Sequence, residues 1–280
     1  MTNKGFRTSP AGGIAAPPYT HGPYTFSEDI TFNGNTRISP GRFSLEENFL
    51  RIPNASASIT AAFSNADATD SANTALTLIR ENANKDFEIL GTSADIADFS
   101  WSTTGAGLLL ETGSADNDQV IVLPHLLAKH TAWASVLWGT ENQVNWEAQI
   151  RTTAVITPVL IWAGLKLSNT EVIATDANAA YFRYSTDDSN TTIRCITSIA
   201  GTDVNTDSGV TVAVNTNYNL RIEIDSDRLA HFYINNVCVH VSTTLTNDID
   251  LIPYVGLMQL GAGDSSLLLV NEKISRVIFE

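Results

Sequence analysis

The chain has 280 residues, of which 43% are hydrophobic and 16% charged, and its formal net charge is −14. This length allows one large β domain or two small ones, and the apolar fraction is sufficient for a packed core. The acidic excess argues against binding to nucleic-acid phosphates and is more typical of solubility than of a site.

No apolar run approaches the roughly 18–20 residues that span a bilayer. Residues 1–13 contain no hydrophobic segment of the signal-peptide type. We therefore expect a protein that is made and kept in a cytoplasm, with neither nucleic acid nor membrane as a partner.

Residues 1–45 differ in composition from the rest of the chain, because prolines and glycines interleave throughout them. These residues exclude regular helix and central strand over most of the segment. Aromatic residues nevertheless recur in it, and a solvated linker seldom carries so many. We predict an extended arm over residues 1–45 that docks on a neighbouring molecule through Tyr19, Tyr24 and Phe26. An arm wrapped on its own domain is the alternative, and residues 46–280 form the β domain in either case.

Short segments with strand character follow, separated by turns rich in Gly, Asn, Asp and Ser. In addition to residues 218–241, strands are expected at residues 49–52, 75–80, 85–90, 108–112, 120–123, 145–152, 159–167, 180–184, 193–199, 253–258 and 274–279. Residues 159–167 are nearly continuous and apolar, which is typical of a strand covered on both faces. A short helix is expected only within residues 126–136.

The clearest strand signal covers residues 218–241. Leu220, Ile222 and Ile224 alternate with polar residues, as in a strand with one buried face. A polar turn at residues 225–228 and the pair Asn235–Asn236, which tolerates positive φ, divide the segment into three antiparallel strands. We expect the other strands to pack on or beside this meander. Many short strands with almost no helical periodicity predict an all-β fold, a two-sheet antiparallel β-sandwich.

Several landmarks after Trp146 resemble the concanavalin A-like jelly-roll superfamily of lectins and glucanases. The resemblance is carried by the strands at residues 146–152, 161–167 and 180–184 and by the hairpin of residues 218–236. It implies a jelly-roll sandwich for residues 46–280.

Three further segments resemble structural proteins of tailed bacteriophages: D-N-D-Q-V-I-V-L-P-H-L, T-A-W-x-x-V-L-W-G-T-E-N-Q and G-V-T-V-A-V-N-T-N-Y-N-L-R-I. This second likeness covers residues 75–280. It implies a virion structural protein that is synthesised in the host cytoplasm and decorates a capsid as a cement or head-fibre protein. Major capsid or tail proteins are then the partners of the arm, and a homo-oligomer, a trimer, is expected. A carbohydrate-binding adhesin of a tail fibre or tailspike, with a surface glycan as partner, is the alternative.

One expected strand carries Glu147, Gln149 and Arg151 on one face. Retaining glucanases need two carboxylates about 5 Å apart, and only Glu147 is an acid here. Glu223, opposite Glu147 on another strand, is the alternative source of a second acid. We expect Glu147 to face solvent and the protein to have no enzymatic activity.

The histidines show no spacing typical of metal ligands, since His125 and His130 lie five residues apart rather than four. Oxygen-rich turns at residues 116–118, 187–188 and 225–227 can hold calcium or simply form turns. No D-x-D-x-D-G loop is present, and no cofactor is expected.

Two tryptophans, Trp133 and Trp138, lie in an irregular segment and are candidates for contact with a glycan. Packing in the core is the alternative reading of both side chains. Cys195 and Cys238 lie on expected strands as free thiols, and a disulfide between them is left open because nothing in the sequence fixes their separation.

Overall fold

The computed structural model describes residues 41–49, 53–55, 84–92, 98–103, 106–124, 131–167, 176–187 and 191–278. The chain divides into two compact units, Met1–Ser39 and Pro40–Glu280, and every described residue belongs to the second unit. The docking candidates Tyr19, Tyr24 and Phe26 lie outside the described residues, as do the expected strand at residues 75–80 and the histidines 125 and 130.

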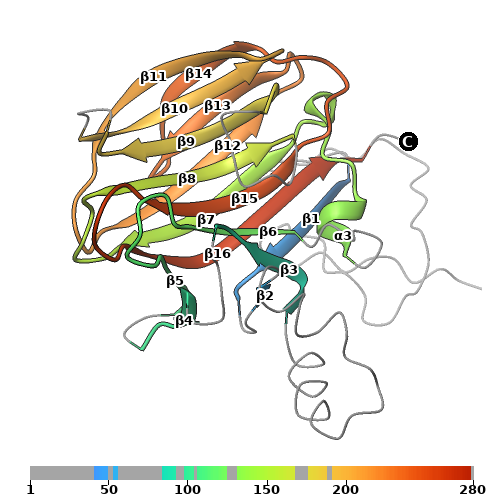
Figure 1. Ribbon diagram of the computed structural model, residues 1–280. Helices are drawn as coiled ribbons and strands as arrows, with labels where there is room; N and C mark the ends of the chain where they lie inside the picture. Colours follow the sequence, from blue (N-terminus) through green and yellow to red (C-terminus); the bar gives the residue numbers. More distant parts are fainter. Residues whose placement is uncertain are drawn as a thin grey trace, which may run out of the picture. The chain divides into compact units, whose positions relative to one another are not determined.

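Strands make up most of the described residues (Figure 1). Their bounds are β1 Arg42–Glu47, β2 Pro53–Ala55, β3 Asn84–Leu90, β4 Phe99–Trp101, β5 Leu108–Glu111, β6 Gln119–Pro124, β7 Asn145–Thr152, β8 Val159–Lys166, β9 Ala179–Ser185, β10 Thr192–Ile199, β11 Thr202–Thr211, β12 Asn217–Ile224, β13 Leu229–Ile234, β14 Val237–Thr244, β15 Ile252–Gln259 and β16 Ser266–Val277. One turn of helix, α3 Ala132–Ser135, and a 3₁₀ turn, η3 Thr140–Asn142, precede β7.

The strands form two eight-stranded sheets that stack as layers (Figure 1). Sheet 1 has the order β14-β13-β12-β7-β16-β5-β4, with β1 also paired to β16. Sheet 2 has the order β11-β10-β9-β8-β15-β6-β3-β2. All pairings are antiparallel except that of β2 with β3. The predicted two-sheet antiparallel sandwich is confirmed.

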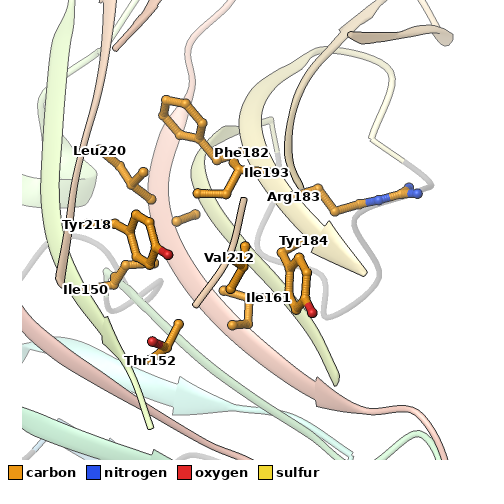
Figure 2. A pocket seen from close by; sticks show the side chains of 11 residues that line it. Ile150, Thr152, Ile161, Phe182, Arg183, Tyr184, Ile193, Val212, Tyr218 and Leu220 are labelled. Atoms are coloured by element: carbon orange, nitrogen blue, oxygen red, sulfur yellow. The ribbon is translucent and has the colours of Figure 1, made fainter. Parts of the chain in front are cut away.

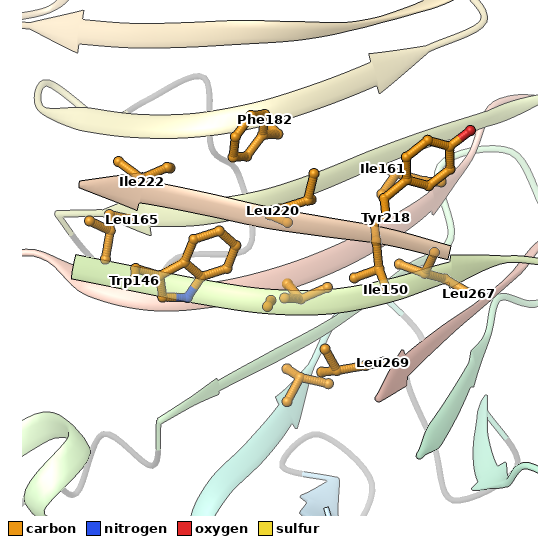
Figure 3. Packing of buried hydrophobic residues seen from close by; sticks show 14 of the residues in the cluster. Trp146, Ile150, Ile161, Leu165, Phe182, Tyr218, Leu220, Ile222, Leu267 and Leu269 are labelled. Carbon is orange, nitrogen blue, oxygen red and sulfur yellow. The ribbon is translucent and has the colours of Figure 1, made fainter. Parts of the chain in front are cut away.

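The core lies between the two sheets and is built from alternating residues of each strand. In β7, burial alternates strictly, so that Trp146, Ala148 and Ile150 face inward. Figure 3 shows Trp146 and Ile222 of sheet 1 among core residues that include Leu165 and Phe182 of sheet 2. Because inward positions recur every second residue, the opposite positions of β7 and β12 all point outward from sheet 1.

The predicted meander is present, and its turns form as expected. Asn235 and Asn236 adopt φ values of 51° and 66° between β13 and β14. The meander is not central, however, because β14 is the edge strand of sheet 1. The valines of β14 therefore do not form a third buried run: Val237 is 63% exposed and Val241 is also exposed. Two register shifts against β13 bend this edge strand, and such bulges protect an edge against further pairing.

The continuous apolar segment at residues 159–167 is covered on both faces, as predicted. It forms β8 in the interior of sheet 2, and seven of its eight residues are buried. Inward residues such as Ile161 belong to the main core, whereas Trp162 belongs to a second apolar cluster on the outer face of sheet 2.

Three boundaries differ from the sequence expectations. The strand β1, Arg42–Glu47, crosses the predicted boundary at residue 45, because its backbone pairs with β16. Phe49 is a buried residue with a φ of 49° rather than the start of a strand. The expected helix within residues 126–136 amounts to the single turn α3 among the described residues.

Both cysteines are free thiols, Cys195 buried and Cys238 exposed, so the disulfide left open by the sequence does not form here. Among the described residues, no helix has the length and apolar character needed to cross a membrane.

Candidate functional site

The outward-facing side chains of β16, β7, β12 and β13 form a polar surface on sheet 1, here called the open face. The strand registers place these side chains in three rows. The first row contains Asn271, Gln149 and Asn219, next to the Asn235–Asn236 turn; the second contains Lys273, Glu147, Arg221 and Tyr233; the third contains Ser275, Asn145, Glu223 and His231.

A hollow with a volume of about 230 Å³ lies between the first and second rows. Its lining side chains are polar: Glu147, Gln149, Asn219, Arg221, Asn236 and Asn271, beside Ala148 and Leu220 of the underlying strands. Each amide offers a carbonyl acceptor and two N–H donors. The hollow therefore presents donors and acceptors in close succession, with one carboxylate and one guanidinium among them.

Arg221 is the most constrained side chain of the second row. Its guanidinium carbon lies 3.8 Å from the ring centroid of Tyr233, and its Nη1 lies 3.5 Å from Oε2 of Glu223. Asn145 Nδ2 donates to Glu147 Oε1 over 3.0 Å. These contacts hold the side chains around the hollow without filling it.

Burial raises the pKa of the Tyr233 hydroxyl, and the charge of Glu223 adds to this increase, while Arg221 lowers it. Tyr233 therefore remains an uncharged donor at neutral pH. Two carboxylates, Glu147 and Glu223, face two cations, Arg221 and Lys273, across the second and third rows. The charges of these two rows balance, and Arg151, the next outward residue of β7, adds a further cation to the open face, although the whole chain carries −14.

His231 in the third row is fixed by Asp225, whose Oδ2 lies 2.8 Å from the His231 Nε2. The other oxygen of Asp225 accepts hydrogen bonds from the backbone N–H groups of Asp227 and Leu229. Partial burial opposes ionisation of Asp225, but the hydrogen bonds from His231, Leu229 and Asp227 outweigh it and lower the pKa of this carboxyl. The turn at residues 225–227 thus uses its carboxylate internally.

The two acids considered from the sequence lie on the same face but are not opposite each other. Arg221 is the cross-strand partner of Glu147, and Glu223 is the partner of Asn145. Glu147 and Glu223 are therefore diagonal neighbours, for which a separation of about 7–8 Å is typical.

Trp133 and Trp138, the glycan-contact candidates, are core residues that are 4% and 1% exposed. The ring of Trp133 packs edge-on against Phe87 at 4.8 Å, and Trp138 Nε1 donates to the Trp133 carbonyl over 2.7 Å. The structure therefore corrects their selection: core packing, the alternative reading, holds for both. Among the described residues, the exposed tryptophan is Trp101 on β4.

Among the residues that the structure describes, no group of three or more His, Cys, Asp or Glu side chains is arranged to hold a metal ion. In the turn at residues 116–118, Asp118 Oδ2 accepts from the backbone N–H of Ala115 over 3.3 Å. Asp118 therefore shapes its own turn, while the turn at residues 187–188 lies partly outside the described residues.

The outer face of sheet 2, here called the covered face, has the opposite character. Its side chains Trp162, Tyr181 and Tyr254 are buried, and Lys166 forms an ion pair with Asp176 over 3.4 Å. Burial raises the pKa of Tyr181 to about 12. These groups are closed off from solvent, whereas β11 at the edge of the same sheet is exposed or half-exposed at every position.

Figure 2 shows a third feature, a cavity of about 20 Å³ between the sheets. Its lining is apolar apart from Thr152, Arg183 and two tyrosines. The hydroxyl of Tyr218 donates to the Thr211 carbonyl, and that of Tyr184 donates to the Ile156 carbonyl. A space of this size holds about one water molecule, so the cavity is a packing gap rather than a ligand site.

No protein-family model matches the sequence, and no curated protein sequence matches it. Among solved structures, a protein of unknown function from Shewanella oneidensis MR-1 is similar, with 12% identity and a TM-score of 0.54 over 87% of this chain and 90% of that chain. A Bacillus licheniformis β-glucanase is similar with 10% identity and a TM-score of 0.47, over 69% and 94% of the two chains. The alginate lyase A1-II′ of polysaccharide lyase family 7 is similar with 13% identity and a TM-score of 0.47, over 66% and 86%.

The fold is an all-β sandwich of two antiparallel sheets. The sandwich that the resemblance after Trp146 implies is therefore confirmed, and its assignment to the concanavalin A-like superfamily stays a prediction. None of the three similar structures is named as a virion protein, so the virion interpretation still rests on the sequence resemblance alone.

One expectation is overturned by the comparisons. We expected a protein without enzymatic activity because the sequence lacks a close acid pair on one strand. The similar structures include an alginate lyase and a β-glucanase. The lack of that one arrangement is thus no ground for excluding catalysis on this fold.

Proposed function

We propose that this protein binds a saccharide through the hollow on its open face. The observation that carries the proposal is the lining of the hollow: four amides, one carboxylate and one guanidinium around about 230 Å³. A sugar hydroxyl is one donor and two acceptors, so adjacent hydroxyl groups are matched by side chains that donate and accept in alternation.

The same lining disfavours other ligand classes. An apolar small molecule needs a predominantly hydrophobic pocket, and every side chain that projects into this hollow is polar. A nucleic acid needs a strongly basic surface, whereas Glu147 and Glu223 offset Arg221 and Lys273 in the rows around the hollow. A neutral, hydroxyl-rich ligand therefore fits the hollow best.

A saccharide-binding face favours the second of the two virion interpretations, a carbohydrate-binding adhesin of a tail fibre or tailspike. The docking of residues 1–45 on other virion proteins, the trimer and the capsid-decoration alternative remain predictions from the sequence. Compact unit Pro40–Glu280 supplies the proposed binding domain in each of these settings.

The test is a glycan array of neutral and acidic saccharides probed with the full chain, followed by calorimetry on the strongest binder. Asn219→Ala and Gln149→Ala each remove a lining amide and are expected to weaken binding about five- to tenfold, the loss of roughly one hydrogen bond. Asn205→Ala makes the same change at an exposed position of β11 and is the matched control.

The chain length of the recovered saccharide is measured in the same samples, so that cleavage is recorded together with binding. Absence of binding to every saccharide contradicts the proposal. An equal loss of affinity in Asn205→Ala also contradicts it, because the hollow then has no special role.

A further inference from the structure

We infer that the ligand of the open face is an uncharged oligosaccharide that extends from the hollow along β12 to the third row. This inference rests on the proposed function and names the class and the orientation of the ligand. It concerns Asn145, Glu223 and His231, which lie outside the lining of the hollow.

The size of the hollow is the first argument. At about 230 Å³, it is smaller than the roughly 300–1,000 Å³ of usual small-molecule sites. A ligand confined to the hollow makes few contacts. These contacts come from the first and second rows and from Asn236, and the third row supplies none. A ligand that continues along the strands reaches the third row without any rearrangement of the backbone.

The spacing of the rows is the second argument. Successive outward residues of one strand lie about 6.8 Å apart, so the first and third rows are separated by roughly 14 Å along β12. Asn219, Arg221 and Glu223 mark this path on β12. The path is polar at each step, which suits a chain that carries hydroxyl groups along its whole length.

The hydrogen bonding of the second and third rows is the third argument. Arg221 Nε and Asn145 Oδ1 are buried atoms that have no hydrogen-bond partner within the described part of the chain. Unpaired buried polar atoms are destabilising, and a rotation of either side chain toward a bound hydroxyl removes this cost. The contact with Asp225 occupies His231 Nε2, which leaves Nδ1 as the ring nitrogen that can form a hydrogen bond with a ligand hydroxyl.

The surroundings of the three rows set the direction of the ligand. Across the strands, the third row ends at Val241 of β14, which is exposed and apolar. Along the strands, on the far side of the hollow, Asn217 of β12 pairs with Arg151, and within the described part of the chain neither has a buried polar atom that lacks a hydrogen-bond partner. Glu147 and Glu223 offset Arg221 and Lys273 within the second and third rows, so these rows exert no net attraction on a charged chain and suit an uncharged one.

The experiment measures dissociation constants of the full chain for cello-, malto-, laminari- and chito-oligosaccharides of one to six units. For the series that binds, affinity is expected to rise at least tenfold with length and then to level off. Glu223→Gln and His231→Asn are expected to remove most of this gain and to leave the affinity for the single unit unchanged within about twofold. Asn217→Ala is the control on the opposite side of the hollow. It is expected to change neither the affinity for the single unit nor the gain in affinity with chain length.

The outcomes separate the inference from the proposed function. If short and long saccharides bind equally, or if Asn217→Ala removes the gain with length instead, the path along β12 is wrong and the saccharide site stands. If none of these series binds but an acidic saccharide of the array does, the inference is wrong and the saccharide site stands. If no saccharide of the array binds either, both are wrong. Thermal unfolding of each variant, followed by circular dichroism, shows whether a lost affinity reflects lost folding.

Discussion

The outer faces of the two sheets differ in polarity, although the two inner faces pack against each other in one common apolar core. On sheet 1, the open face alternates strictly with the core, and its side chains are amides, carboxylates and cations. On sheet 2, the covered face repeats the apolar character of the core, with Trp162, Tyr181 and Tyr254 buried. Both sheets are eight-stranded, so the number of strands does not account for the difference.

The contrast shows where a sandwich of this kind can bind a polar ligand. A charge on the covered face must be paired inside the protein, as Lys166 is with Asp176. A charge on the open face stays partly hydrated and can exchange water for ligand hydroxyls at low cost. Stability should therefore depend on the covered face, and binding on the open face.

The largest expected effect on stability comes from comparing an ion pair on the covered face with an ion pair on the open face. Asp176→Ala leaves the Lys166 ammonium buried without its carboxylate and is expected to lower the free energy of unfolding by about 3–5 kcal/mol. Glu223→Ala breaks the pair with Arg221, whose side chains are 29% and 46% exposed, and should cost less than about 1 kcal/mol. Urea denaturation of the three proteins measures both values.

A double replacement, Lys166→Met with Asp176→Leu, extends this test. It removes both charges together and is expected to recover most of the stability lost in Asp176→Ala. Equal costs for Asp176→Ala and Glu223→Ala would show that the covered face is hydrated in solution.

The next effect concerns Glu272, which points into the core directly beneath the open face. Its carboxylate accepts a hydrogen bond from Trp146 Nε1 over 2.7 Å. Burial raises the pKa of Glu272 from 4.5 to about 8, with the Trp146 hydrogen bond opposing the increase and Glu47 adding to it. Between these two pH values the folded chain holds a proton that the unfolded chain releases, so stability falls as pH rises, by about 1.4 kcal/mol per pH unit.

Glu272→Gln keeps the shape of the side chain and removes its ionisation. The variant is expected to match the wild type below about pH 4.5 and to exceed its free energy of unfolding by about 3 kcal/mol at pH 7. Glu147→Gln, on the outer side of the neighbouring strand, should show no such difference. A wild-type stability that rises between pH 5 and pH 8, with no gain in Glu272→Gln, would refute this assignment.

The sequence identified the elements whose two faces differ clearly. The segment at residues 145–152 and the hairpin at residues 218–234 have strict alternation, and their buried and exposed positions were predicted correctly. Polar and apolar residues do not alternate in the segment at residues 159–167, and this correctly indicated a strand that is buried on both faces.

Several strands were missed or predicted only in part, and the structure gives a physical reason for two of them. β11 is exposed or half-exposed at every position, so it has no apolar pattern to detect. β16 was predicted only at its C-terminal end because a register shift between Leu269 and Asn271 changes the alternation and because its inward residue Glu272 is polar.

The site was harder to predict than the fold. Gln149 and Asn219 are outward positions of predicted strands, so their exposure was predictable. Their proximity to Asn271 was not, because it depends on the pairing of β7 with both β12 and β16, strands that are distant in sequence. The sequence favoured two tryptophans, and none of these amides, as glycan contacts, although four of the five tryptophans are buried.

The smallest expected effect is the most direct test of the division between the two faces. Arg221→Ala removes the guanidinium that stacks on Tyr233 and lines the hollow, and it should lower the free energy of unfolding by only about 0.5–1 kcal/mol. Phe232, one residue from Tyr233 on the inward side of the same hairpin, is fully buried, and Phe232→Ala should cost about 3–5 kcal/mol. Chemical denaturation of both variants measures the two losses in free energy of unfolding and so allows them to be compared. If Arg221→Ala costs as much as Phe232→Ala, the open face is itself part of the folding core, and a loss of saccharide affinity in that variant no longer reports on the hollow.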